Sequence, residues 1–510
     1  MTRVQSLVLL VNSMTLSEKK AFRIKSCRAR TEPNYIVLYD AIEKNGSLTI
    51  AALRKKFLNH RPGASFETSA GYLFELLLHS MLGLRLEQDS FYGLFNKISE
   101  ARILYEKSLF NECFELLNEV MAQAEKYENY YALLLASRLE LEYLLSLNFP
   151  NLSEKALLKK QFKLNEYLKY LRKINEQSSL FEILKHRVVY KGHPRSPKQK
   201  NELNDLVFSE LSLVASQNLE NFEIRKLHQL FQSNYLINVG DYKSALHSYY
   251  ELNTLFEANK HLWSTPPVYY LNMIEGVLES LRGIRNYQGM SYFIDQLNKI
   301  KSTSVDFRIN LTCLTFQYEL FPFLDTGDFY RCLELMKHYK ISLYDKFSSL
   351  DRVRQTELCL YTSLVYLGIS EFHKAHKFLN QIFISVKNFS FLPIYRTVRL
   401  VNLIILYSLG DFDLIKYEIR SMKRDLSGTD KGYKIERFLF RFLSKSPPAI
   451  IPNRKKHWDK IRVAYDEMHN DVFEQQILRI FDFTAWLESQ IRKIPLSEIL
   501  KNKMNPLSSN

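Results

Sequence analysis

The side chains that most often carry out chemistry are scattered along this 510-residue chain. Its five cysteines occur singly, with no Cys-x-x-Cys pair and no histidine at ligand spacing: Cys27, Cys113, Cys313, Cys332 and Cys359. A structural zinc site needs about four ligands at short spacings, and a disulfide framework needs several cysteines close together in the sequence. Most of these cysteines lie in apolar helical patterns, so we expect buried, reduced thiols.

The pair that most resembles a metal site is His373 with His376. Histidines three residues apart can share a helix face, but no acidic or cysteine partner accompanies them. Lys374 and Lys377 lie beside them, which is typical of a solvated surface. We therefore predict no metal site.

Glycine-rich and nucleophile motifs are also missing. The chain contains 15 Gly, with no phosphate-binding loop, no Gly-x-Ser-x-Gly elbow and no His-Glu-x-x-His sequence. Carboxylate pairs match the i, i+4 spacing of ordinary helix salt bridges. We expect neither enzyme activity nor a bound cofactor.

The composition predicts long helices. Hydrophobic residues make up 46% of the chain, while only 15 Gly and 14 Pro are available for turns. The apolar run at residues 7–11 is too short to cross a bilayer, and no segment reaches about 18 uninterrupted apolar residues. We expect an all-α, cytoplasmic protein without a membrane segment.

A recurring motif sets the organisation of the chain. In each copy a small or polar pair precedes an aromatic residue, with a small or apolar residue three positions later and an apolar residue seven positions later. The aromatic residues lie 45, 42, 43 and 40 residues apart: Tyr242, Tyr287, Phe329, Phe372 and Phe412. A near-constant period of this length indicates stacked supersecondary units.

Each copy of the motif predicts two helices and the turn between them. An apolar residue six positions before the aromatic residue ends the first helix: Leu236, Leu281, Phe323, Tyr366 or Leu406. Gly-Asp or its equivalent then breaks the helix, because glycine accepts the left-handed conformation and aspartate caps the next helix. An earlier copy begins at Phe110.

The stretch from Tyr235 to Tyr249 resembles the central part of a tetratricopeptide repeat (TPR), with its Gly-Asp-Tyr turn and its Ala and aromatic positions. The resemblance implies an α-solenoid of TPR-like helical hairpins over roughly residues 100–425, whose first helices line a concave face. In that register, five polar residues are candidates to bind a peptide backbone or a terminal carboxylate on that face: Asn234, Asn272, Glu275, Arg282 and Gln317.

Four segments follow from these patterns. Residues 1–90 form an N-terminal basic helical module, and residues 91–440 form the TPR-like solenoid. Residues 441–456, rich in proline and lysine, form a linker, and residues 457–510 form a C-terminal helical cap. The cap contains a strongly amphipathic helix at 471–493, for which homodimerisation is the alternative role. The opening of the chain, with Leu-Ser-Glu-Lys-Lys, is also similar to that of uncharacterised bacterial TPR-containing proteins.

The net charge of +15 is concentrated in two zones. Residues 1–65 contain twelve Lys and Arg against four Asp and Glu, and residues 151–200 contain thirteen against four. The predicted basic patch comprises Lys19, Lys20, Arg23, Arg28, Arg30, Arg54, Lys55, Lys56, Lys159, Lys160 and Lys163. Such zones attract nucleic acid, acidic proteins or anionic lipid through the same long-range field.

Two functions compete on these observations. The preferred one is a non-enzymatic protein- or peptide-binding scaffold that uses the concave face. The alternative is a nucleic-acid-binding regulator with a helix-turn-helix-like reader at 35–83 and a TPR-like sensor. Against the alternative, the helix at 66–82 carries Glu67 and Glu75 but no Lys or Arg. A recognition helix normally brings cationic and amide side chains to the DNA.

Overall fold

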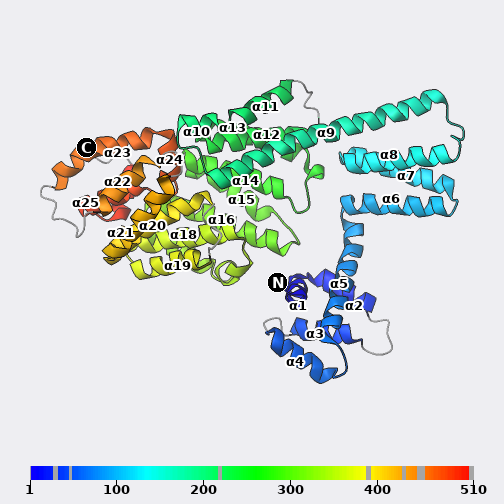
Figure 1. Cartoon of the computed structure of the whole chain (residues 1–510), viewed down its shortest axis with the longest axis horizontal. Coiled ribbons are helices and arrows are strands. Elements are labelled where there is room, and N and C mark those ends of the chain that lie inside the picture. The colour runs from blue at the N-terminus through cyan, green and yellow to red at the C-terminus, as the bar shows by residue number, and fades with distance from the viewer. Residues whose placement is uncertain are drawn as a thin grey trace. The chain divides into compact units, whose positions relative to one another are not determined.

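The computed structural model describes residues 2–26, 33–44, 49–215, 221–385, 392–427, 432–444 and 454–504 (Figure 1). These residues form 26 α-helices and two short 3-10 helices, and no strand occurs among them. The predicted all-α class is confirmed. None of the described helices combines the length and the apolar character that crossing a bilayer requires.

The chain divides into two compact units, Met1–Arg172 and Lys173–Asn510. Helix α9 (Glu154–Lys191) contributes residues to both units. The boundary predicted near residue 90 lies within the first unit, between α5, which ends at Gln88, and α6, which begins at Ser90. The predicted linker at 441–456 lies largely outside the described residues, between the end of α22 and the start of α23.

The N-terminal helices of the first unit pack around one long helix, α5. The unit contains α1 (Arg3–Ser13), α2 (Leu16–Ser26), α3 (Asn34–Lys44), α4 (Ile50–His60), α5 (Phe66–Gln88), α6 (Ser90–Glu106), α7 (Phe110–Lys126), α8 (Tyr130–Ser146) and the first part of α9. Helix α5 packs against each of α1, α2, α3 and α4. Its Leu73 and Leu77 are fully buried in the resulting core. The helix that a DNA-reading role would place in a groove is therefore the central core helix.

The second unit consists mainly of consecutive helix pairs. Its helices are the end of α9, α10 (Pro197–Asn201), α11 (Asn204–Ala215), α12 (Phe222–Asn238), α13 (Tyr242–Ala258), α14 (Val268–Gly283), α15 (Tyr287–Lys299), α16 (Val305–Thr326), α17 (Phe329–His338), α18 (Arg352–Gly368), α19 (Phe372–Ser385), α20 (Pro393–Leu409), α21 (Phe412–Ser427), α22 (Lys434–Leu443), α23 (Arg454–Asn470), α24 (Val472–Leu478), α25 (Phe483–Arg492) and α26 (Leu496–Met504). The 3-10 helices are η1 (Lys260–Leu262) and η2 (Tyr344–Ser349). Neighbouring helices pack along the chain from α12 to α21, as the green-to-orange ribbons of Figure 1 show.

The predicted hairpin turns are confirmed, but each first helix ends two or three residues after the residue that was predicted to end it. Every aromatic residue of the motif is the first residue of the second helix of its pair. The preceding residue donates its backbone N–H, at 2.8–3.0 Å, to the carbonyl of the predicted helix-ending residue: Asp241 to Leu236, Asn286 to Leu281, Asp328 to Phe323, Glu371 to Tyr366 and Asp411 to Leu406. The residue between helix and cap has a positive φ in all five turns: Gly240, Arg285, Gly327, Ser370 and Gly410. This is a Schellman-type helix end followed directly by a new helix.

The aromatic residues also connect successive hairpins. A Cβ atom added at Gly283, at the end of α14, would lie 2.5 Å from Cγ of Tyr242, which begins α13. A Cβ atom added at Gly368 would lie 2.5 Å from Cγ of Phe329. The first residue of one second helix therefore packs against the end of the first helix in the next hairpin.

The C-terminal helices lie along the row of hairpin turns. Gln476 of α24 donates to the carbonyl of Asn238 at 3.1 Å, at the end of α12. Further along, Ser497 is beside the Gly327 turn, and the rings of Tyr407 and Trp486 are 5.7 Å apart. The C-terminal segment therefore contacts hairpins from α12 to α20 and is not confined to the last one.

The amphipathic helix predicted at 471–493 is wrong as a single helix. It is two helices, α24 and α25, because Asp482 starts the second by accepting a hydrogen bond from the backbone N–H of Ala485 at 2.8 Å. The apolar residues Ile477, Trp486 and Ile491 are buried within the second unit.

Candidate functional site

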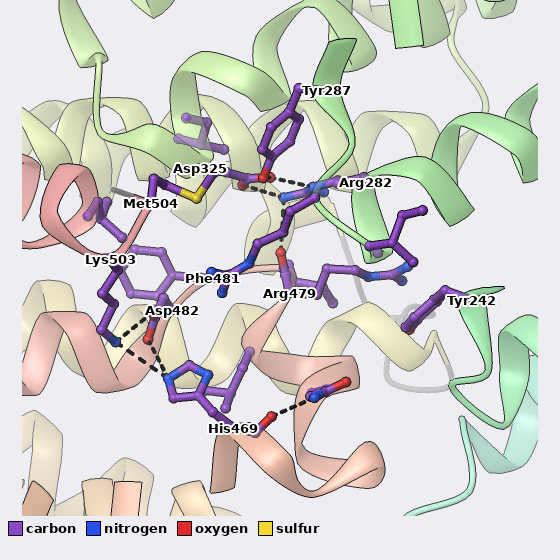
Figure 2. A pocket seen from close by; sticks show the side chains of 18 of the residues that line it. Tyr242, Arg282, Tyr287, Asp325, His469, Arg479, Phe481, Asp482, Lys503 and Met504 are labelled. Atoms are coloured by element: carbon purple, nitrogen blue, oxygen red, sulfur yellow. Dashed lines mark hydrogen bonds and ion pairs between the residues drawn. The ribbon is translucent and has the colours of Figure 1, made fainter. Parts of the chain in front are cut away.

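A cavity of about 640 Å³ lies in the second unit where two hairpin turns meet the C-terminal helices (Figure 2). One wall comes from the α14–α15 and α16–α17 turns, and the other comes from the ends of α23, α24 and α26. Its volume is within the range of about 300–1,000 Å³ that is usual for ligand pockets. We therefore treat it as the candidate functional site.

Arg282 is the best-anchored cation of the hairpin wall. Its Nε and Nη2 donate to the two carboxylate oxygens of Asp325, each at 2.8 Å, and Nη2 also donates to the carbonyl of Arg479 at 3.0 Å. The guanidinium carbon lies 3.6 Å from the ring centroid of Phe321. Burial alone would lower the pKa of Arg282, but the Asp325 carboxylate raises it above the usual range.

Arg479 follows α24 and brings a second guanidinium to the cavity. It donates to the Glu279 carboxylate at 2.6 Å, and its guanidinium carbon lies 4.4 Å from the ring centroid of Tyr242. Burial raises the pKa of Glu279, but the positive charge of Arg479 opposes this effect, and the net shift of the pKa is downward. This pair links the C-terminal segment to α14.

The opposite wall is a cluster centred on Asp482. Lys503 donates to Asp482 at 2.9 Å and to Thr484 at 2.9 Å, and Thr484 donates to Asp482 at 2.6 Å. His469 Nε2 lies 2.7 Å from the Thr484 hydroxyl. Figure 2 shows His469, Asp482 and Lys503 together, across the cavity from Arg282 and Asp325.

The Asp482 cluster has the residue types of a catalytic triad but not its geometry. A triad base accepts the proton of the hydroxyl, and the carboxylate contacts the other ring nitrogen. Here the Thr484 hydroxyl donates to Asp482, and Asp482 lies 3.7 Å from the same Nε2 of His469 that faces Thr484. Thr484 is also 1% exposed. The arrangement therefore favours a cap that holds α25 over an activated nucleophile.

The chain has no match among known proteins. No family, no curated protein and no solved structure matches it. The interpretation of the cavity therefore rests on its own geometry.

No described group of three His, Cys, Asp or Glu side chains is placed to hold a metal ion. Four of the five cysteines are buried free thiols, as expected, and Cys27 lies outside the described residues. Burial raises the pKa of Cys313, Cys332 and Cys359 to about 12. His373 is exposed and His376 is half-buried on α19.

Arg282 is the only one of the five predicted peptide-binding residues that lines the cavity. Asn234 is buried and donates to the carbonyl of Leu230 at 2.8 Å, within its own helix. Glu275 accepts from Arg354 at 2.7 Å, and Gln317 is buried and donates to Glu357 at 3.1 Å.

Asn272 differs from the other four because its side chain is exposed. Arg354 bonds both Glu275 and Glu357, and it lies 3.4 Å from Gln317, so these residues form one network between α14, α16 and α18. The structure therefore brings Glu275 and Gln317 to the same residue, Arg354, which connects them between hairpins.

Most of the predicted basic patch is described, and several of its members form ion pairs. Arg28 and Arg30 lie outside the described residues. The partners are Glu43 for Lys19 and Arg23, Glu67 for Arg54, Glu140 for Lys160, and Glu125 for Lys163. Lys20, Lys55 and Lys159 are exposed and Lys56 is half-buried. The positive charge of the patch is therefore partly neutralised by neighbouring carboxylates.

Four residues of the second wall were not predicted from the sequence: His469, Arg479, Asp482 and Lys503. The only local signal was Asp482 before Phe-Thr-Ala, which is typical of a helix N-cap. Nothing in the sequence indicated that this segment lies against turns about 200 residues earlier.

Two histidines predict how stability depends on pH. Burial lowers the pKa of both His193 and His469. The unfolded chain therefore binds more protons than the folded one below about pH 6.5, so stability falls as the pH falls through this value. We expect the thermal midpoint to decrease from about pH 7.5 to about pH 5.5.

His469→Gln should flatten this slope, because glutamine keeps an N–H donor for Thr484 but does not titrate. The matched control is His247→Gln, since His247 is exposed on α13. Protonation of buried Glu436 and Glu474, whose pKa values burial raises above 4.5, acts in the opposite direction, and both variants share this effect. An equal slope in wild type and His469→Gln would contradict the prediction.

Proposed function

We propose that this protein is a non-enzymatic peptide-binding scaffold, an α-solenoid of TPR-like hairpins whose recognition site is the cavity of the second unit. The observation that carries the proposal is that the cavity has fixed walls. Its charged side chains Arg282, Arg479 and Lys503 are each held by carboxylates. A cavity with such preorganised walls binds a ligand without first ordering them.

The repeated turns support the architecture. Five consecutive helix pairs share one turn geometry, and residues of one pair pack against the next. Repeats that contact only their neighbours are typical of solenoids, which use extended surfaces to bind other chains. In this proposal the network of Glu275, Gln317 and Arg354 links neighbouring hairpins. The site of recognition is the cavity and not the concave face.

The size of the cavity and the side chains that line it indicate the type of partner. The cavity is too small for a folded domain, and it combines charged groups with apolar side chains such as Leu324, Phe481 and Met504. A short peptide segment offers both apolar side chains and a polar backbone. The Asp482 cluster lacks triad geometry, so the proposal involves no bond cleavage.

The test is selection of a random peptide library, displayed with free C-termini, on the full chain at about 300 mM salt after nuclease treatment, because salt of this strength screens surface charge. We expect enriched peptides that bind wild type and lose binding to Asn470→Trp, which places a large side chain at the cavity wall. Asn470 is exposed, so this exchange leaves the core intact.

The matched control is His247→Trp, an exposed substitution away from the cavity. Enriched peptides that bind Asn470→Trp as tightly as wild type would contradict the cavity as the site. Recovery of nucleic acid alone, released by salt, would favour the nucleic-acid-binding regulator instead.

A further inference from the structure

The charges that line the cavity do not cancel. Its cations are Arg282, Arg285, Arg479 and Lys503, and its carboxylates are Asp325, Asp466 and Asp482. Each of these carboxylates already has a cationic partner: Asp325 pairs with Arg282, Asp482 with Lys503, and Asp466 with Arg462. Arg479 pairs with Glu279, which is outside the lining.

Arg285 is the lining cation for which no carboxylate partner occurs among the described contacts. It lies in the α14–α15 turn with φ of 58°, its side chain is exposed, and no hydrogen bond or ion pair of its guanidinium occurs among the described contacts. It lines the cavity together with its chain neighbours Ile284 and Tyr287. Its positive charge also contributes to the lowered pKa of His469, for which burial is the largest cause.

One uncompensated guanidinium matches one negative charge. A guanidinium presents its N–H groups in a planar fork that fits the two oxygens of a carboxylate. The rest of the lining is rich in apolar side chains, including Leu324, Phe481, Leu500 and Met504. A ligand with one carboxylate beside an apolar group satisfies both features.

We propose that the cavity binds the free C-terminus of a peptide whose last residue is apolar, with Arg285 paired to the terminal carboxylate. This inference rests on the proposed function and narrows it. The last side chain enters the apolar part of the cavity, and the preceding residues leave through its open side. Arg282 and Arg479 position the walls and do not contact the carboxylate, because carboxylates of this chain already hold them.

The test uses hexapeptides with five random positions and a C-terminal Leu, made as free acids and as mass-tagged amides. Both pools are mixed in equal amounts with the full chain, and retained peptides are counted by mass spectrometry. We expect the free acids to be retained roughly 2- to 5-fold more than the amides, since an ion pair with an exposed arginine is weak.

Arg285→Asn should reduce the retained free acids to the level of the amides without changing the amides. Asparagine tolerates the left-handed conformation, so the turn is kept. The control is Arg331→Asn, an exposed arginine near the start of α17 that does not line the cavity. It should keep the preference for free acids, and the thermal midpoints of both variants check that they fold.

The outcomes separate the two proposals. Equal retention of acids and amides, lost in Asn470→Trp, would overturn the C-terminal inference and keep the peptide-binding function. Retention of no peptide would overturn the C-terminal inference, and the display selection then decides separately whether the peptide-binding function holds. Binding of N-acetyl-leucine that blocks the cavity without any peptide binding would identify a small-molecule carboxylate site and would likewise overturn the inference.

Discussion

Arg282→Met is expected to lower the free energy of unfolding by about 3–5 kcal/mol, the usual loss when one partner of a buried ion pair is removed. The Arg282 side chain is 5% exposed and that of Asp325 is 18% exposed. Methionine fills much of the same volume but leaves the Asp325 carboxylate with only the Tyr287 hydroxyl, at 3.0 Å, among its described side-chain partners. Chemical denaturation followed by circular dichroism measures the loss.

Two further variants identify the cause. Arg282→Met combined with Asp325→Leu should recover much of the lost stability, because an apolar pair of similar volume removes the unpaired charge. Arg331→Met removes an ion pair whose arginine is 65% exposed, and it should change stability by at most about 1 kcal/mol. If Arg282→Met were as stable as wild type, the buried pair would not hold α14 to α16.

Gly368→Ala is expected to destabilise the protein by about 1–3 kcal/mol, the usual cost of overpacking. In most helices this exchange is favourable, because alanine has the higher helix propensity. Here the added methyl group would lie 2.4–2.5 Å from Cδ1 and Cγ of Phe329, whose ring is 3% exposed. The clash includes Cγ, which lies on the axis of ring rotation, so rotation of the ring does not relieve it.

The matched control is Gly71→Ala in α5. Its added methyl group would have one neighbour, Arg3 Nε at 3.9 Å, so we expect a gain of up to about 1 kcal/mol. A double-mutant cycle of Gly368→Ala with Phe329→Leu should show coupling, because leucine removes the clashing ring atoms. Equal effects at Gly368 and Gly71 would show that successive hairpins do not pack through this contact.

The hairpins could be predicted because their signals are local. The Gly240-Asp241-Tyr242 turn contains the helix stop, the cap and the first apolar residue of the next helix within three positions. Residues such as Ala245 and Tyr249, which the motif placed on the buried stripe, are indeed buried. The same reasoning found the turn at Arg285, where no glycine is present, from the aromatic spacing alone.

The cavity could not be predicted because it depends on contacts between distant segments. The repeat register predicted that Arg282 faces the groove. In the structure its side chain is buried and donates to Asp325 and to the carbonyl of Arg479. The break between α24 and α25 was missed because the apolar pattern of 471–493 continues across it. Only the three-dimensional structure shows that Lys503 satisfies Asp482 there.

The most direct test of the central claim is hydrogen exchange of the full chain with and without a peptide recovered by display. The account predicts slower exchange at the α14–α15 turn, at the α16–α17 turn and at residues 466–482, with the effect absent in Asn470→Trp. Protection confined to the N-terminal helices α1–α5, or unchanged by Asn470→Trp, would contradict it and would place recognition outside the cavity.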